Sequence, residues 1–185
     1  MASKDLSIHI DIEEKLEYFI KVQKIPNIIF HGPSGSGKRT IVNNFIKKIY
    51  NNSNVLKKQH VMYVDCGHGR GIKFIREELK FFAKTNIHTS GDIIKSIILL
   101  NADKLTMDAQ SALRRCIELF SNTTRFFIII EDKYKLLRPI LSRFCEIFIA
   151  RPIINNKSTN LHTYNINNLF TTTNYDTNRM KYLKE

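Results

Sequence analysis

A glycine-rich turn between a short apolar run and an amphipathic segment is the feature that most restricts how this chain can fold. The apolar run is Ile28–His31, and the segment Arg39–Tyr50 has helical spacing. Glycines let successive backbone N–H groups point inward at the start of a helix, where Lys38 can reach the outer phosphates of a nucleotide. The pattern G-x-x-x-x-G-K predicts a phosphate-binding loop, and a turn without function is the alternative. The predicted loop residues are Gly32, Pro33, Ser34, Gly35, Ser36, Gly37, Lys38, Arg39 and Thr40.

Short apolar runs alternate with longer amphipathic segments over most of the chain. This alternation is typical of a parallel sheet covered by helices, so we expect a three-layer α/β/α fold with about five parallel strands. The expected strands are Ile28–His31, Val61–Asp65, Lys95–Leu100, Phe126–Ile130 and Glu146–Ile149. The expected helices are Arg39–Tyr50, Ile72–Ala83, Thr106–Phe120 and a short one around Lys135–Ser142, in which Pro139 would be confined to the first turn.

The helix Thr106–Phe120 is the one whose buried face the sequence indicates most clearly. Met107, Leu113, Ile117 and Phe120 would line that face, and Thr106 is the expected N-cap.

Length and composition predict one nucleotide-binding domain over residues 1–152 and an Asn/Thr-rich tail over residues 153–185. We expect a loosely ordered tail, with one strand or helix from Tyr164 to Phe170, although drift in an AT-rich genome would also explain its composition. No apolar run approaches the roughly 18 residues that a membrane helix needs, and no apolar signal region follows Met1, so we expect an intracellular protein. The three separated cysteines, Cys66, Cys116 and Cys145, are expected to be reduced and buried.

The chain carries 29 Lys and Arg against 17 Asp and Glu, a net charge of +12. An excess of this size attracts polyanions, so nucleic acid or nucleotide is the expected partner, while solubility alone is the alternative explanation.

The residues that hold magnesium and activate water in hydrolysing phosphate-loop enzymes are replaced in this chain. Arg39 stands where Ser or Thr would bind Mg²⁺, with Thr40 displaced by one position. Leu100 and Asn101 stand at the end of the strand where acidic residues are expected, and Asp103 follows two positions later. Asp103 is a weak metal candidate, and a surface residue or helix cap is the alternative. We therefore expect Mg²⁺ to bind weakly and the bound nucleotide to be hydrolysed little.

Two acids follow the next strand. Glu131 and Asp132 could substitute as metal ligands, but without a well-held metal their charge would repel a γ-phosphate. A solvated strand end is the alternative interpretation.

Several ordered motifs resemble those of one family, the AAA+ module of clamp-loader small subunits, or replication factor C family, from about Ile8 to Pro152. The matching segments are Gly32–Thr40 (Walker A), Arg70–Arg76 (central basic helix), Asn101–Arg115 (after Walker B) and Ser142–Phe144 (Ser-Arg-Cys). The changes at Arg39, at the acid positions and at Glu131 are similar to the ATPase-defective small subunit of the eukaryotic complex. The basic helix is more similar to the catalytic small subunits.

The resemblance implies an ATP- or ADP-binding subunit in DNA replication or repair, acting at a nucleus or viral replication site. It implies that Arg143 is an arginine finger acting in trans on a neighbour's nucleotide. It also implies that Arg70, Lys73 and Arg76 follow the backbone of duplex DNA, with Lys80 as a further candidate on the same face, whereas a solvated face is the alternative. The implied partners are other clamp-loader-like subunits in a hetero-oligomer and a sliding clamp.

Family members continue into lid and collar domains, which we expect to be missing here, together with the lid's sensor arginine. An Asn/Ile/Lys-rich composition is compatible with a viral or eukaryotic source. Two other functions remain open: a repurposed AAA+ fold serving as a structural adaptor, and an active kinase or NTPase that uses Asp103 or Glu131.

Overall fold

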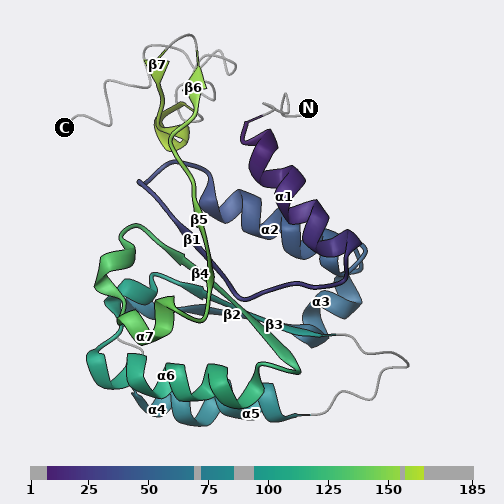
Figure 1. Cartoon of the computed structure of the whole chain (residues 1–185), viewed down its shortest axis with the longest axis vertical. Helices are drawn as coiled ribbons and strands as arrows, with labels where there is room; N and C mark the ends of the chain where they lie inside the picture. The colour runs from purple at the N-terminus through teal and green to yellow at the C-terminus, as the bar shows by residue number, and fades with distance from the viewer. Residues whose placement is uncertain (1–7, 69–71, 86–93, 155–156, 165–185) are drawn as a thin grey trace, which may run out of the picture.

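The central element is a parallel sheet with the strand order β2–β3–β4–β1–β5 (Figure 1). The computed structural model describes residues 8–68, 72–85, 94–154 and 157–164. The strands are β1 (Ile28–His31), β2 (Val61–Asp65), β3 (Lys95–Leu100), β4 (Thr124–Ile130) and β5 (Cys145–Phe148). The expected α/β fold with its five-stranded parallel sheet is confirmed.

Strand β1 lies inside the sheet and pairs with β4 on one side and β5 on the other. At its end His31 pairs with Ile130 of β4 and with Phe148 of β5. The strand β4 begins at Thr124, two residues earlier than expected, because Thr124 is still paired with Lys95 of β3. Three strand ends therefore surround the start of the glycine-rich turn.

Helices cover both faces of the sheet (Figure 1). On one face lie α1 (Ile10–Lys21), α2 (Lys38–Ile49) and α3 (Asn54–His60). On the other lie α4 (Ile72–Phe74), the π-helical η2 (Ile75–Leu79), α5 (Lys80–Lys84) and α6 (Met107–Phe120). The short helix α7 (Arg138–Leu141) precedes β5, and Pro139 falls in its first turn as expected. Short 3-10 turns complete the connections: η1 (Cys66–His68), η3 (Ala102–Lys104) and η4 (Lys133–Lys135).

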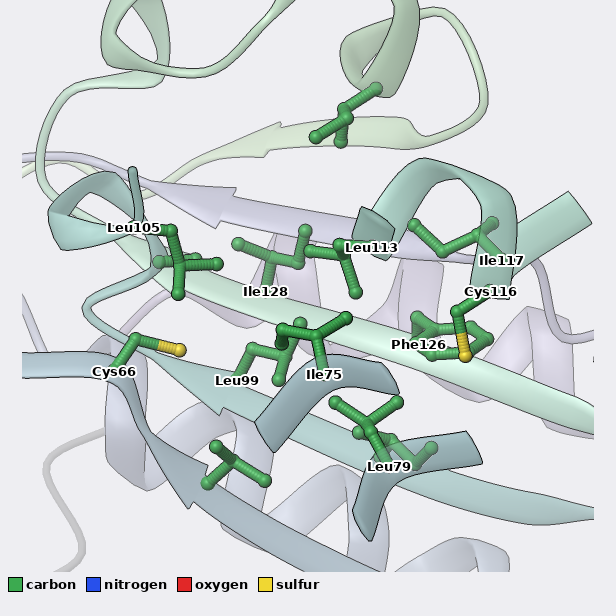
Figure 2. Close-up of a cluster of buried hydrophobic side chains, with 14 of the residues drawn as sticks. Cys66, Ile75, Leu79, Leu99, Leu105, Leu113, Cys116, Ile117, Phe126 and Ile128 are labelled. Carbon is green, nitrogen blue, oxygen red and sulfur yellow. The ribbon is translucent and has the colours of Figure 1, made fainter. Parts of the chain in front are cut away.

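Two hydrophobic clusters hold the layers together because alternate residues of each strand point to opposite faces. Ile29 contributes to one cluster, and Ile28 and Phe30 contribute to the other. Figure 2 shows part of the first cluster, in which Ile75 and Leu79 lie against strand residues that include Leu99.

Helix α6 packs on the sheet through part of the face that the sequence indicates. Leu113 and Ile117 are buried, and the Thr106 hydroxyl accepts a hydrogen bond from the Ala109 N–H at 3.3 Å as the predicted N-cap. The expected burial of Met107 is wrong: this side chain is 64% exposed. Met107 lies six residues before Leu113, which at about 100° per residue places the two side chains about 120° apart around the helix, away from the buried face.

The segment after Arg151 is more ordered than expected over its described part. Strands β6 (Ile153–Ile154) and β7 (Lys157–Ser158) pair antiparallel, and residues 161–164 form a helical turn. The Thr159 N–H donates to the Pro152 carbonyl at 2.9 Å and closes this hairpin. Of the strand or helix expected from Tyr164 to Phe170, all but Tyr164 lies outside the described residues.

The three cysteines carry free thiols. Cys66 and Cys116 are buried as expected, and Cys145 is half-buried. Among the described residues, no helix has the length and apolar composition that crossing a bilayer requires.

We predict that Leu113→Ala lowers the free energy of unfolding by about 2–5 kcal/mol, because it removes a fully buried side chain and leaves a cavity between α6 and the sheet. The matched control is Leu119→Ala on the same helix, which is 64% exposed and should change stability by less than about 0.5 kcal/mol. Urea titration of both variants checks the prediction. Equal losses of unfolding free energy in Leu113→Ala and Leu119→Ala would contradict this description of the core.

Candidate phosphate-binding site

The glycine-rich turn Gly32–Gly37 joins β1 to α2 at the carboxyl end of the sheet. In the sheet, β2, β3 and β4 lie on one side of β1 and β5 lies on the other, so the strand order changes direction at β1. Open α/β sheets bind ligands at such a point, outside the carboxyl ends of the strands. The strand, turn and helix that the sequence predicts at this position are all present.

Close contact between the turn and β5 requires a glycine at position 32. Gly32 has φ of 147°, and a Cβ atom placed on it would lie 2.2 Å from the Ile149 carbonyl oxygen. Any side chain here would push the turn away from the sheet.

The Lys38 side chain is folded back into the turn. Its ammonium donates to the carbonyls of Gly32 at 2.6 Å and Pro33 at 2.7 Å. Burial lowers the pKa of Lys38, while the nearby carboxylate of Glu131 opposes that shift and Arg151 adds to it. A phosphate placed at the turn would offer the ammonium a charged acceptor in place of two neutral carbonyls.

Every carbonyl of the turn from Gly32 to Gly37 accepts a hydrogen bond. The donors, in order along the turn, are Lys38 Nζ for Gly32 and Pro33, Arg151 Nε for Ser34 at 3.2 Å, Leu161 N for Gly35 at 2.9 Å, His9 Nε2 for Ser36 at 3.0 Å and Ile41 N for Gly37 at 3.1 Å. In a planar trans peptide the N–H points away from the C=O. The carbonyls of Ser34, Gly35 and Ser36 bond to segments outside the turn, so the N–H groups that follow them point to the other side, and successive N–H groups of this kind form an anion-binding nest.

A pocket of about 210 Å³ lies inside the turn. Its lining residues are Ser34, Gly35, Ser36, Gly37, Lys38, Arg39, Thr40, Asn101, Ile129, Ile130, Glu131, Leu161 and His162. Seven of the nine predicted loop residues, Ser34 to Thr40, thus face one space. Gly32 and Pro33 contribute their carbonyls to Lys38 instead.

The strand end that would carry acidic groups in a hydrolysing enzyme carries none. Leu100 is buried, and Asn101 adopts a left-handed conformation with φ of 55°. The Asn101 amide donates to the Asp65 carboxylate at 2.9 Å, and the same carboxylate oxygen accepts from Gly67 N at 2.9 Å. Asn101 is therefore held by the neighbouring strand β2 while it lines the pocket.

Asp103 is absent from the pocket lining. Its side chain is 7% exposed, and its carboxylate lies 3.9 Å from the Lys135 ammonium. Asp103 is thus the ion-pair partner of a lysine and is not among the residues that line the pocket.

The residues present do not form a prepared magnesium site. Across the described ranges, no three His, Cys, Asp or Glu side chains gather in a group able to hold a metal ion. The side-chain oxygen donors of the pocket are the Glu131 carboxylate, the Asn101 amide and the hydroxyls of Ser34, Ser36 and Thr40, and Arg39 separates Lys38 from Thr40 in the sequence. Magnesium beside a nucleotide takes one or two carboxylates in addition to phosphates and waters, so Glu131 is the one charged ligand that this lining would supply. Asp132 instead accepts a hydrogen bond from Tyr134 N at 2.9 Å.

Arg143 lies at the opposite end of the sheet from the pocket, because it precedes β5 whereas the glycine-rich turn follows β1 and the two strands are parallel. Its guanidinium contacts the Glu118 carboxylate at 2.5 Å, and both side chains are partly exposed. This position excludes a contact with the nucleotide pocket of the same chain.

The basic helix presents its cations on an exposed surface. Lys73, Arg76 and Lys80 are exposed, whereas Arg70 lies outside the described residues. Arg76 and Lys80 line a groove of about 660 Å³ together with Arg115 of α6. The cationic surface therefore extends over two helices, and Arg115 is a contributor that sequence reasoning missed.

Four residues around the loop were also missed: His9, Arg151, Leu161 and His162. They lie between 23 and 130 positions from Gly32 in the sequence, and the Asn/Thr-rich segment has no periodicity to show its packing. Only the fold brings them together.

Comparison with known proteins gives a consistent family signal, although no protein-family model matches the chain. The replication factor C small subunit of Sulfolobus acidocaldarius is 37% identical over 133 residues, which are 72% of this chain and 40% of that protein. The protein of the same name from Aeropyrum pernix is 36% identical over 143 residues, 77% of this chain and 42% of that protein. The chain thus spans about two-fifths of the length of these archaeal relatives.

Solved structures agree on the fold. A DNA polymerase III gamma subunit-related protein from Thermotoga maritima superposes with a TM-score of 0.60 at 19% identity, covering 72% of this chain and 45% of that one. Cdc6p from Pyrobaculum aerophilum gives 0.57 at 12% identity, covering 82% and 47%. These are P-loop AAA+ proteins, as the sequence motifs predict.

We predict that Glu131→Gln raises affinity for ATP by roughly 3- to 10-fold and affinity for ADP by less, because Glu131 lies near the lysine that reaches the outermost phosphate. Calorimetric titration without magnesium measures both constants. Asp132→Asn removes the same charge one residue later, outside the pocket, and should leave both constants unchanged. An equal gain for ATP and ADP would contradict the placement of Glu131 at the terminal phosphate.

Proposed function

We propose that this chain, which belongs to the replication factor C small-subunit family, is a clamp-loader-like AAA+ subunit that binds ATP or ADP and hydrolyses it slowly, if at all. The observation that carries the proposal is the turn Gly32–Gly37, in which every carbonyl accepts a hydrogen bond and two of the carbonyls hold the side chain of Lys38. Its N–H groups and the lysine would supply the hydrogen-bond donors and the positive charge that bind a nucleotide's phosphates.

Slow hydrolysis follows from what surrounds that turn. Turnover needs a base to orient water and a metal to neutralise charge on the phosphates. Here Leu100 and Asn101 hold the positions of the acids, and the one carboxylate in the pocket, Glu131, repels a γ-phosphate when no metal lies between them.

We predict that Lys38→Met weakens ADP and ATP binding by about 10- to 100-fold, because a charge-assisted hydrogen bond to phosphate is lost while the side-chain volume is kept. Lys47→Met, on an exposed position of the same helix, is the matched control and should bind normally. Titration calorimetry and a melting curve for each variant separate loss of binding from loss of folding. Unchanged affinity in Lys38→Met would refute nucleotide binding at this loop.

We further propose that Arg143 acts on a nucleotide bound by a neighbouring subunit. A guanidinium stabilises negative charge on a phosphoryl group in transfer, and Arg143 lies too far from its own pocket to do so there. Glu118 would hold the arginine until the neighbour's phosphate replaces the carboxylate. The chain would then take part in catalysis without hydrolysing its own nucleotide.

The complex purified with a tagged chain tests this role. Arg143→Ala should lower its DNA-stimulated ATPase at least 10-fold without dissolving the complex. Arg138→Ala, an exposed arginine on α7, is the control and should leave the rate unchanged. Co-purification of unrelated structural proteins without ATPase would instead favour a repurposed AAA+ fold acting as an adaptor.

We propose that the cationic surface of α4, η2 and α5 binds the backbone of duplex DNA without reading sequence. Lys73, Arg76 and Lys80 are exposed on it, and Arg115 adds a fourth cation from α6. Partners of the complex would include other small subunits and a sliding clamp, in intracellular DNA replication. Residues 1–152 would form the nucleotide-binding domain, with 153–185 as an extension.

We predict that the double variant Lys73→Ala/Arg76→Ala weakens DNA binding and lowers the slope of log affinity against log salt by about two, since each phosphate contact contributes about 0.9. Lys47→Ala/Lys58→Ala removes the same charge from the other face of the sheet. Fluorescence anisotropy over a salt series measures the DNA affinity of the two double variants and of the wild type. Equal slopes for the two double variants would assign DNA binding to net charge alone.

A further inference from the structure

Residues 160–164, which we call the strap, cover the outer side of the phosphate loop. The Leu161 N–H donates to the Gly35 carbonyl at 2.9 Å. A Cβ atom on Gly35 would lie 1.9 Å from Asn160 Oδ1, and one on Gly37 would lie 3.1 Å from Leu161 Cδ1. Gly35 also has φ of 74°, so both its backbone conformation and the strap beside it require a glycine.

The strap is held in shape by its own hydrogen bonds. Asn160 Oδ1 accepts from His162 N at 2.9 Å, and the Asn160 carbonyl accepts from Tyr164 N at 2.9 Å. Asn160 is thus the N-cap of a helical turn whose first residue is Leu161. This turn presents the Leu161 N–H to the loop as a donor of fixed direction.

The bond from Leu161 fixes the orientation of one peptide group of the loop. The Gly35 carbonyl and the Ser36 N–H belong to the same planar trans peptide and point in opposite directions. With the carbonyl held outward by the strap, the Ser36 N–H is directed toward the inside of the loop. His9 acts in the same way on the next peptide through the Ser36 carbonyl at 3.0 Å.

We propose that the strap is a positioning segment for the phosphate loop, which holds the Gly35–Ser36 peptide in its nucleotide-binding orientation. This inference rests on the nucleotide binding proposed above. Because coupling between two equilibria is reciprocal, bound nucleotide also holds the strap on the loop. The strap then becomes more ordered when the loop is occupied, so residues 160–164 report the nucleotide state of the site.

The opposite arrangement, a strap that obstructs the pocket, is the competing account, since Leu161 and His162 also line the 210 Å³ space. The hydrogen-bond pattern favours the positioning role, because the Leu161 N–H donates to the Gly35 carbonyl and leaves the N–H groups of the loop to bind the ligand. The two accounts predict opposite changes in affinity when the strap is loosened.

The comparison of Leu161→Pro with Leu161→Ala isolates the bond. Both variants lose the leucine side chain, but only proline lacks the N–H, and proline is tolerated at the first position of a helical turn. We expect Leu161→Pro to bind fluorescent ADP about five-fold more weakly than Leu161→Ala, as loss of one hydrogen bond predicts. Thr163→Ala, an exposed change in the same turn, should match the wild type. The melting temperatures of the two Leu161 variants should agree, since the strap is a surface segment.

Hydrogen exchange of the wild-type chain with and without ADP supplies a second readout. ADP should slow exchange in peptides that contain residues 160–164, and this slowing should be lost in Leu161→Pro. Equal or tighter ADP binding by Leu161→Pro, or faster exchange of the strap with ADP, overturns the positioning role alone. Failure of the wild-type chain to bind either ADP or ATP overturns the proposed function and the positioning role together.

Discussion

Hydrogen bonding of six consecutive carbonyls, from Gly32 to Gly37, is the constraint on which the candidate site depends. Without those bonds the peptides of a glycine-rich turn could rotate, and the N–H groups would lose their common direction. The donors come from the loop lysine, from both ends of the described chain and from α2. The sheet places β1 between β4 and β5, and this order brings such distant donors to one loop.

The same pocket is the basis for the proposal that binding and turnover separate in this chain. The nest and Lys38 would interact with phosphates in the ground state, whereas hydrolysis needs groups that act on water and on charge developing in the transition state. Asn101, held by Asp65, cannot serve as a base, and Arg39 supplies a positive charge but no metal ligand. The proposed action of Arg143 on another subunit would let such a chain assist catalysis elsewhere.

Local sequence patterns predicted the strands and helices well, because such patterns depend on residues that are close together in the sequence. Apolar runs of four to six residues identified the strands, and Thr106 identified the start of α6, since capping depends on residues three apart. The loop residues from Ser34 to Thr40 were found by the same kind of signal. Contacts made by His9, Arg151 and Leu161 could not be predicted, because they depend on tertiary placement of segments without periodicity. Met107 failed for a different reason: it lies six residues before Leu113, a spacing that does not place two side chains on the same face of a helix.

A single measurement tests the central claim that this loop binds a nucleotide without turning it over. The purified chain is mixed with a slight excess of ATP and magnesium, held for several hours, separated from free nucleotide, and its bound nucleotide is identified by chromatography. The account predicts near-stoichiometric nucleotide on the protein, with the free pool remaining ATP. Conversion of many equivalents of ATP to ADP, abolished by Lys38→Met, would contradict it, and so would protein that carries no nucleotide at all.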